Sequence, residues 1–369
     1  MSSLPKNLDW GTRENPKLPD VVLRKFLELR GEPLAVEDFR DVKCMEICSS
    51  SFKAQTPKVS VCMLTYNHEA FLEQAILGVV NQKTTFPFEL IIGNDCSTDR
   101  TQEIAVKYQQ LYPDKIIVLS MERNTRGQEN SRRVFGRARG EYVAFCEGDD
   151  YWINDDKLQM QADYLDAHPK VGLVHMLCQT DKAGEIIPPH QVGRAYIGAN
   201  EGDENQYWYD YFKVGIATCT VMMRGKISAE THRVSPLLKL PLRMKDVIRW
   251  MDCLRQGYDI SFIPVLTACY RVNPNSVSNL NFGYLRVFID SQLVVLCFAR
   301  WCRKRYSYRE FEQKITDFQF RLACRENNPR KILHWMSFSI LRGKFLSLKE
   351  YVRGILCLLK LRNECQSVS

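Results

Sequence analysis

Three short apolar runs stand out in the first half of the chain, and each ends abruptly in a polar cluster. The runs at 58–65, 88–92 and 142–145 are rich in β-branched and aromatic residues, as strands buried on both faces are. Helical patterns at 70–81 and 101–111 follow the first two runs. Strands alternating with helices predict βαβ units, a parallel sheet and the α/β fold class.

The later part of the chain continues the alternation with weaker signals. The pattern predicts a strand at 115–120, a helix from 155 to 168, a strand at 171–178, a hairpin turn at 181–184, a strand at 218–224, a helix from 244 to 257 and strands at 258–269. From 282 to 360 the pattern is helical.

The polar clusters at 66–69, 94–99 and 147–150 come directly after the three apolar runs. Carboxyl ends of parallel strands meet at one edge of a sheet, and open α/β sheets bind ligands there, so the three clusters predict one shared site. Each cluster alone also fits a turn or a helix cap, because Asp, Asn and Ser favour both. His68 in particular is expected to be exposed or to cap a helix.

The third cluster, Glu147-Gly148-Asp149-Asp150, concentrates negative charge. Three carboxylates in four residues repel one another, and a cation usually offsets such a cluster. Hard oxygen ligands suit Mg²⁺ or Mn²⁺, and Gly148 allows the backbone to turn sharply beside a ligand. We predict that Glu147, Asp149 and Asp150 bind a divalent metal ion; a solvated acidic turn is the alternative.

The length and composition of the chain limit the number of domains and the cellular compartment that we expect. The 369 residues suffice for one large domain with appendages or for two domains. The 14 cysteines form no Cys-x-x-Cys pair and no apolar signal segment opens the chain, so a reducing cytoplasm with free thiols is expected. No uninterrupted apolar run approaches the roughly 18 residues of a membrane span.

The net charge of +8 is unevenly distributed. Residues 281–369 hold about 17 Lys and Arg against about 7 Asp and Glu, roughly +10, which leaves about −2 for the rest. Apolar helical segments with interspersed basic residues, at 332–341 and 351–361, could lie on an anionic membrane surface. Packing on the main domain and formation of a homo-oligomer stay open as alternatives.

The beginning of the chain carries no recognisable chemistry. It reads as an extension with a short helix at 21–30, capped by Asp20 and ended by Gly31. The expected parts are an N-terminal extension at 1–56, an α/β domain at 57–280 and a basic helical region at 281–369.

Two motifs resemble those of a known enzyme family. Residues 59–101, with Leu-Thr-Tyr-Asn and Asn-Asp-Cys-Ser-Thr-Asp, resemble the nucleotide-binding half of family 2 glycosyltransferases. Glu-Gly-Asp-Asp-Tyr-Trp at 147–152 looks like the Asp-x-Asp region in bacterial polysaccharide-assembly enzymes of that family. The similarity covers about residues 57–280. It implies the GT-A fold, a Rossmann-like, mostly parallel sheet with flanking helices, followed here by a helical C-terminal region.

The resemblance implies roles for individual residues on the donor side. Asp95 matches the carboxylate that hydrogen-bonds uracil or an equivalent base, and Thr65 lies where the first strand touches the nucleoside. Arg271 lies in a segment similar to the loop that closes over the diphosphate, and its planar fork suits phosphate. The expected donor-binding residues are Thr65, Tyr66, Asn67, Asp95, Ser97, Asp149 and Arg271.

The resemblance also implies roles on the acceptor side. Asp246 matches the general base, although an Asp in a first helical turn is favoured by the helix dipole alone. Asp252, further along the same predicted helix, is expected to be exposed. Trp152 and Trp208 are weaker acceptor candidates. Sugars can stack on the aromatic stretch 207–211 that contains Trp208, and core packing is the alternative for that stretch.

Together these features imply an inverting glycosyltransferase of the hexosyltransferase class that depends on Mn²⁺ or Mg²⁺. The expected donor is a nucleotide-diphosphate-sugar, with UDP as the expected nucleotide. The expected acceptor is a hydroxyl of a glycan or lipid-linked intermediate in surface polysaccharide biosynthesis. The expected location is the cytoplasm, with attachment to the inner face of the plasma membrane left open.

Two other functional classes stay open. A nucleotidyltransferase of similar fold should show a Gly-rich phosphate loop near the first strand, and 64–70 has none. A non-catalytic protein that binds a nucleotide-sugar or nucleic acid could use the basic region alone, but the intact acidic cluster argues against it. No nucleic-acid partner is expected.

Overall fold

The computed structural model describes residues 5, 7–31, 37–49, 56–189, 216–243, 245–272, 283–303, 308–341, 351–352 and 354–358. The chain forms two compact units. The first unit contains Met1–Val36, Ser235–Ile248 and Pro274–Ser369; the second contains Glu37–Val234 and Arg249–Asn273. These boundaries differ from the expected ones, because residues from Glu37 onward join the second unit.

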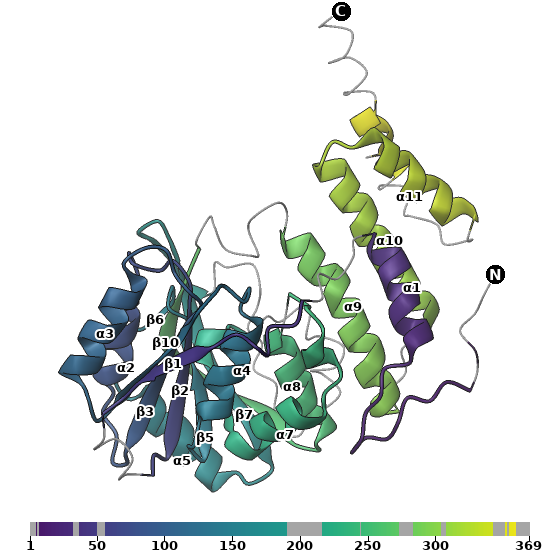
Figure 1. The fold of residues 1–369 in the computed structure, drawn as a ribbon. Helices are drawn as coiled ribbons and strands as arrows, with labels where there is room; N and C mark the ends of the chain where they lie inside the picture. The colour runs from purple at the N-terminus through teal and green to yellow at the C-terminus, as the bar shows by residue number, and fades with distance from the viewer. Residues whose placement is uncertain are drawn as a thin grey trace, which may run out of the picture. The chain divides into compact units, whose positions relative to one another are not determined.

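Within the described part of the second unit, ten strands form one sheet (Figure 1). They are β1 (Cys44–Ile47), β2 (Val59–Thr65), β3 (Phe88–Asn94), β4 (Ile116–Met121), β5 (Tyr142–Phe145), β6 (Tyr151–Trp152), β7 (Val171–Lys182), β8 (Glu185–Ile187), β9 (Met222–Arg224) and β10 (Asp259–Arg271). The order is β1-β4-β3-β2-β5-β9-β7-β10-β6, and β8 pairs with β7. β4, β3, β2 and β5 run parallel, as do β7 and β10. The predicted α/β class with a mostly parallel sheet is confirmed.

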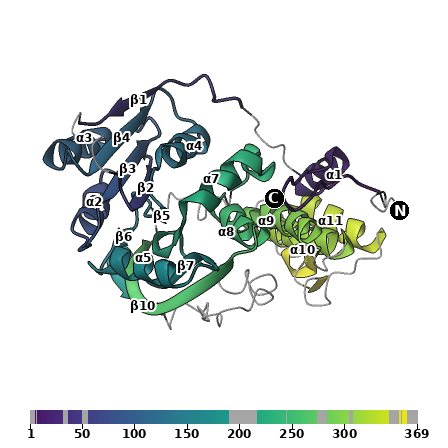
Figure 2. The same ribbon diagram turned by 90° about the horizontal axis from the view of Figure 1, so that it is seen from below.

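Helices cover both faces of this sheet, which explains why its central strands are apolar throughout. The helices of the second unit are α2 (Leu72–Val80), α3 (Thr101–Leu111), α4 (Gln128–Arg137), α5 (Lys157–Ala167) and α7 (Gly225–Val234). α2 and α3 lie on one face and α4 on the other (Figure 2). Alternate residues of β2, Val61 and Met63, enter the core with Ile76 of α2.

The predicted elements were incomplete in three places. β1 lies in the expected extension and pairs antiparallel with β4, so part of that extension belongs to the sheet. The predicted strand at 218–224 is a 3₁₀ turn, Thr218–Thr220, followed by β9. Helices α4 and α7 were not predicted. α4 is mostly polar and buries few apolar side chains, among them Val134 and Phe135, so its apolar periodicity is short.

The regular secondary structure in the described part of the first unit is mainly helical. It contains α1 (Asp20–Arg30), α9 (Gly283–Trp301), α10 (Tyr308–Arg325) and α11 (Pro329–Leu341), while α8 (Lys245–Arg255) begins in it and ends in the second unit. A buried ion pair joins Arg30 of α1 to Asp290 of α9 at 2.8 Å. Gly31 ends α1 in the left-handed region, as predicted, but Asp20 is its first helical residue and Pro19 its cap. None of the described helices is long and apolar enough to cross a bilayer.

Candidate active site

The three polar clusters lie at one edge of the sheet, as the sequence predicted. Thr65 at the end of β2 is in register with Asn94 at the end of β3. β5 pairs with β2 on the other side, and the Gly148 N–H beyond β5 donates to the Leu64 carbonyl at 2.9 Å. The segments that follow β2, β3 and β5 are therefore neighbours.

Hydrogen bonds tie the loop after β2 to the loop after β3. The Asn67 N–H donates to Ser97 Oγ at 3.0 Å, and Asn67 Oδ1 accepts from the Thr98 N–H at 2.8 Å. Asp99 accepts from the Glu69 N–H at 3.0 Å. Asn67 and Ser97, expected to bind the donor, thus also hold the two loops together.

Asp95 is buried beneath these loops, with 2 % of its surface exposed. Its Oδ1 accepts from Thr125 N–H at 2.9 Å and Thr125 Oγ at 2.6 Å, and its Oδ2 accepts from the Gly127 N–H at 2.7 Å. Gly127 has φ 73° and directly precedes α4. Asp95 therefore anchors the turn that starts α4, and its contact with a base stays a prediction.

The acidic loop places its carboxylates in different surroundings. Asp150 is buried, and its Oδ1 accepts from the Arg271 main-chain N–H at 2.9 Å. Burial, with the neighbouring charge of Asp149, raises the pKa of Asp150 to about 8. Asp149 keeps 19 % of its side chain exposed. The structure thus favours Asp149 over Asp150 as the carboxylate that meets a ligand.

His68 faces Asp149, with 3.7 Å between its Nε2 and Asp149 Oδ2. The expectation that His68 is exposed or caps a helix was wrong, since 15 % of its side chain is exposed. Burial lowers the pKa of His68, and the charge of Asp149 opposes this. In the sequence, only the position of His68 in the polar cluster after the first predicted strand pointed to a place in the site.

The backbone of Gly148 packs closely against Thr65 and His68. A Cβ at this position would lie 2.8 Å from Thr65 Oγ and 2.9 Å from His68 Nδ1, so a side chain would collide there. Both atoms are buried and have no hydrogen-bond partner among the described residues. Unsatisfied buried polar atoms are costly, and a ligand's polar group can supply the missing bonds.

The donor set fits a divalent ion that a ligand helps to hold. Within the described residues no three His, Cys, Asp or Glu side chains are arranged as a metal site by themselves. Mg²⁺ in nucleotide sites is commonly bound by one or two carboxylates, with phosphate oxygens and water completing its shell. Asp149 suits that arrangement, and His68 is its nearest titratable neighbour.

Arg271 ends β10 behind the acidic loop. Its guanidinium donates to the Asp149 carbonyl at 2.8 Å and to Gln74 Oε1 at 2.6 Å. The rings of Phe71 and Tyr151 lie 4.6 and 4.8 Å from it. The expected diphosphate contact stays a prediction, and the present contacts are with the protein.

Residues 60–229 match the family model described as Glycosyl transferase family 2. This part of the chain belongs to glycosyltransferase family 2. An uncharacterised protein of Mycobacterium tuberculosis strain H37Rv is 41% identical over 112 residues, which are 30% of this chain and 32% of that protein. The matched segment thus spans about a third of this curated relative.

Other family 2 relatives extend the similarity along the chain. The putative teichuronic acid biosynthesis glycosyltransferase TuaG of Bacillus subtilis strain 168 is 26% identical over 263 residues, covering 70% of this chain and 98% of TuaG. The crystal structure of Staphylococcus aureus TarS 1–349 with UDP-GlcNAc has a TM-score of 0.51 at 18% identity, covering 82% of this chain and 79% of that chain. It supports the predicted fold.

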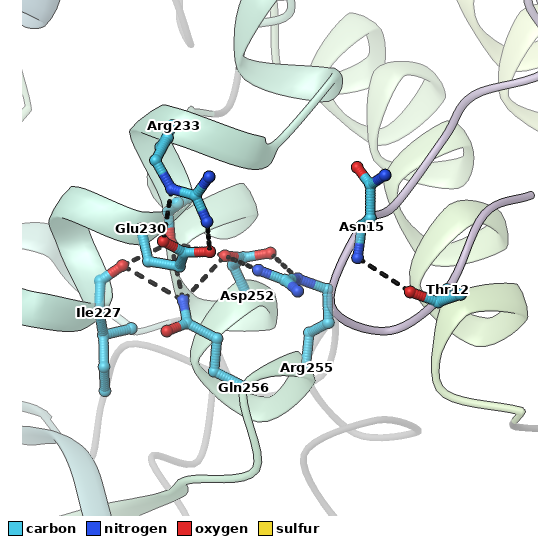
Figure 3. A network of polar contacts seen from close by, with 9 residues as sticks. Thr12, Asn15, Ile227, Glu230, Arg233, Asp252, Arg255 and Gln256 are labelled. Atoms are coloured by element: carbon cyan, nitrogen blue, oxygen red, sulfur yellow. Dashed lines mark hydrogen bonds and ion pairs between the residues drawn. The ribbon is translucent and has the colours of Figure 1, made fainter.

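The family's expected base and its neighbour on α8 differ in their surroundings. Asp246 lies in the first turn, as predicted, in the part of α8 that belongs to the first unit. Asp252 was expected to be exposed, and this was wrong: it is fully buried (Figure 3). Its oxygens accept from Arg255 Nε at 2.5 Å, Thr231 Oγ at 2.6 Å and Gln256 Nε2 at 3.0 Å. Thr231 belongs to α7, so the local pattern of α8 could not reveal this burial.

The acceptor candidates receive little support. Trp152 is 5 % exposed, its Nε1 donates to the Cys219 carbonyl at 2.7 Å, and Lys157 Nζ lies 4.1 Å from its ring centre. Trp152 therefore packs in the core, and the structure gives no support to its role as an acceptor platform. Trp208 lies outside the described residues.

Proposed function

We propose that the protein is an inverting glycosyltransferase that moves a sugar from a nucleotide-diphosphate-sugar, with UDP as the expected nucleotide, to a hydroxyl. The family 2 domain supports the reaction class. The observation that carries the proposal is the partly exposed Asp149 beside His68 and Gly148 at the carboxyl edge of the sheet. The proposed acceptor is a hydroxyl of a glycan or lipid-linked intermediate. The names of two relatives, a putative teichuronic acid biosynthesis glycosyltransferase and a poly(ribitol-phosphate) beta-N-acetylglucosaminyltransferase, support the glycan part of this proposal.

The residues of the sheet edge take the donor side of the proposed mechanism. Asp149 would hold Mn²⁺ or Mg²⁺ together with the diphosphate, and Glu147 lies in the same loop to assist. Such an ion supplies Lewis-acid stabilisation of the charge that grows on the leaving diphosphate. Thr65 Oγ and His68 Nδ1 can hydrogen-bond the donor, because neither has a partner within the described protein. Asp150, held by the Arg271 N–H, keeps the loop in shape.

Asp246 takes the acceptor side. As general base it accepts the proton of the acceptor hydroxyl while that oxygen attacks the anomeric carbon from the face opposite the diphosphate. A single displacement without a covalent intermediate inverts the anomeric configuration. The proton ends on the Asp246 carboxylate and the electron pair of the broken bond on the diphosphate.

We also propose that the protein acts in the cytoplasm and that its basic helical region, residues 281–369, lies against the inner face of the plasma membrane. In α11, Leu333 and Ile340 are 53 and 55 % exposed, and the exposed Arg330 lies on the same helix. Such a mixture suits an anionic bilayer surface. Sedimentation with anionic and with neutral vesicles tests this, and equal binding or no binding to both would contradict it.

A donor screen tests the reaction class. UDP- and GDP-sugars are titrated by calorimetry with Mn²⁺ and with EDTA, and released products are identified. We expect metal-dependent donor binding and slow release of a free nucleoside diphosphate. Release of pyrophosphate would indicate a nucleotidyltransferase, and full transfer in EDTA would exclude the metal assignment. The Asp149→Ala variant should lose the metal-dependent part of the donor affinity. The control Asp155→Ala, an exposed acid paired with Lys83, should keep it.

A further inference from the structure

We infer that Arg271 is a positioning residue, whose guanidinium holds the acidic loop against α2 and so places Asp149, instead of binding the donor diphosphate. Arg271 and all its partners named here belong to the second unit. The inference rests on the proposed function for the identity of the ligand at Asp149. The contacts within the protein stand apart from it.

Arg271 makes hydrogen bonds to two segments and an ion pair with a third. Nη1 donates to the Asp149 carbonyl at 2.8 Å, and Nη2 donates to Gln74 Oε1 at 2.6 Å on α2. Nε lies 3.6 Å from Asp181 Oδ2 at the end of β7. The main-chain N–H donates to Asp150 Oδ1 at 2.9 Å. One residue thus fixes both the backbone of Asp149 and the side chain of Asp150.

Two aromatic rings also lie next to the guanidinium. Its central carbon lies 4.6 Å from the ring centre of Phe71 and 4.8 Å from that of Tyr151, distances at which cation–π attraction acts. The side chain of Arg271 keeps 9 % of its surface exposed. A phosphate reaching this side chain would compete with its bonds to the Asp149 carbonyl and to Gln74, so the geometry favours a structural brace for the loop.

Lysine cannot reproduce this brace. Its ammonium is a compact point charge, whereas arginine offers a planar fork that can bond two acceptors and present flat faces to aromatic rings. Arg271→Lys therefore keeps the positive charge and the main-chain bond to Asp150, and removes the side-chain bonds to the Asp149 carbonyl and Gln74. A phosphate contact that depends mainly on charge should survive this change better than the placement of Asp149 does.

Arg224 provides a matched control. Its Nε donates to the Val171 carbonyl at 2.9 Å, its Nη2 donates to the Leu165 carbonyl at 2.7 Å, and it lies 5.7 Å from the Tyr142 ring. Arg224 pairs with Tyr142, the first residue of β5, and so lies at the opposite end of that strand from the acidic loop. Arg224→Lys should destabilise the fold in a similar way without moving Asp149.

The first measurement is amide hydrogen exchange of a peptide covering residues 147–152, without ligand. In Arg271→Lys we expect exchange of this peptide to speed up at least about tenfold, the effect of losing one hydrogen bond to a charged group. In Arg224→Lys it should stay within about twofold of wild type, as for sites that do not interact. Unchanged exchange in Arg271→Lys would overturn the inference.

The second measurement is calorimetry with UDP, with Mn²⁺ and with EDTA. Positioning predicts that Arg271→Lys weakens the Mn²⁺-dependent affinity by at least about tenfold and leaves the EDTA affinity within about twofold. Equal losses in both conditions would assign Arg271 to the phosphate. If wild type binds no UDP in either condition, the UDP assignment fails, and the exchange measurement still decides the role of Arg271.

If the Arg271→Lys variant does not fold, the Gln74→Leu variant tests the same inference. Gln74 is exposed on α2, so its substitution leaves the core and Arg271 itself in place. We expect the same changes in exchange and Mn²⁺-dependent affinity, but smaller ones, because the other contacts of Arg271 remain. A Gln74→Leu protein identical to wild type in both measurements would count against the brace.

Discussion

Two buried polar clusters in the second unit differ in how fully their hydrogen bonds are made. Around Asp252, both carboxylate oxygens have donors from Thr231, Arg255 and Gln256 (Figure 3). At the sheet edge, Thr65 Oγ and His68 Nδ1 are buried without a partner in the described protein. A satisfied cluster stabilises the fold, whereas an incomplete one costs free energy until a ligand completes it. This difference distinguishes the polar network around Asp252 from the sheet edge where we propose that the donor binds.

Asp246→Asn gives the largest expected effect; it tests the proposed base, which lies on the same helix as the structural acid Asp252. Asparagine keeps the shape and can still favour the helix start, but it cannot accept a proton at neutral pH. We expect turnover to fall about 10² to 10⁴-fold, with folding and donor affinity near those of wild type. Turnover is measured with a working acceptor and donor affinity by calorimetry. Activity within about threefold of wild type, far short of the loss for a missing base, would move the base elsewhere.

Asp252→Asn tests the structural side. Removing one charge of the buried pair leaves Arg255 uncompensated, and we expect the free energy of unfolding in urea to fall by about 3 to 5 kcal/mol. Glu230→Gln, which breaks the more exposed pair with Arg233, should cost about 1 kcal/mol or less. A folded Asp252→Asn protein with wild-type stability and no turnover would reverse the assignment.

Lys157 lies under the acidic loop and gives the smallest expected effect. It is fully buried, and its Nζ donates to Gln161 Oε1 at 2.6 Å. Burial lowers the pKa of Lys157 from 10.5 to about 7. Between these values the unfolded chain binds a proton that the folded one does not, so this group makes stability rise with pH.

The contribution of Lys157 is at most about 1.4 kcal/mol per pH unit in that window. In Lys157→Met this contribution to the pH dependence of stability should disappear. Urea unfolding of the variant and of wild type between pH 7.5 and about 9.5, inside this window, measures the difference in slope. The slope decides the outcome, because the substitution also changes packing. Equal slopes in the two proteins would show that Lys157 keeps its charge in the fold.

The fold was largely predictable because its central strands are continuous in sequence. β2, β3 and β5 are short apolar runs buried on both faces, and the helices after β2 and β3 repeat the 3.6-residue period. The mostly polar α4 and the exposed edge strand β1 carried no such signal. A local hydrophobic pattern reveals a buried element only where successive residues of one face, or of both faces, are buried by apolar contacts.

The candidate site was predictable in place but not in orientation. The acidic loop lies where the sequence put it, yet the inward turn of Asp150 depends on Arg271, 121 residues further along the chain. The burial of Trp152 depends on Cys219, and the exclusion of His68 from solvent depends on how two loops meet. None of these partners lies in the local pattern.

The sequence by itself determined the strand–helix alternation, the edge where the acids gather and the family to which residues 60–229 belong. Each follows from residues that are neighbours in the chain. The tertiary structure decided that Asp149 stays partly exposed beside His68 while Asp150, Asp252 and Trp152 are buried. A side chain is buried and hydrogen-bonded by whichever segment packs next to it in the folded protein. The energy of that contact does not depend on how far apart the two segments are in the sequence, so local sequence patterns do not reveal it.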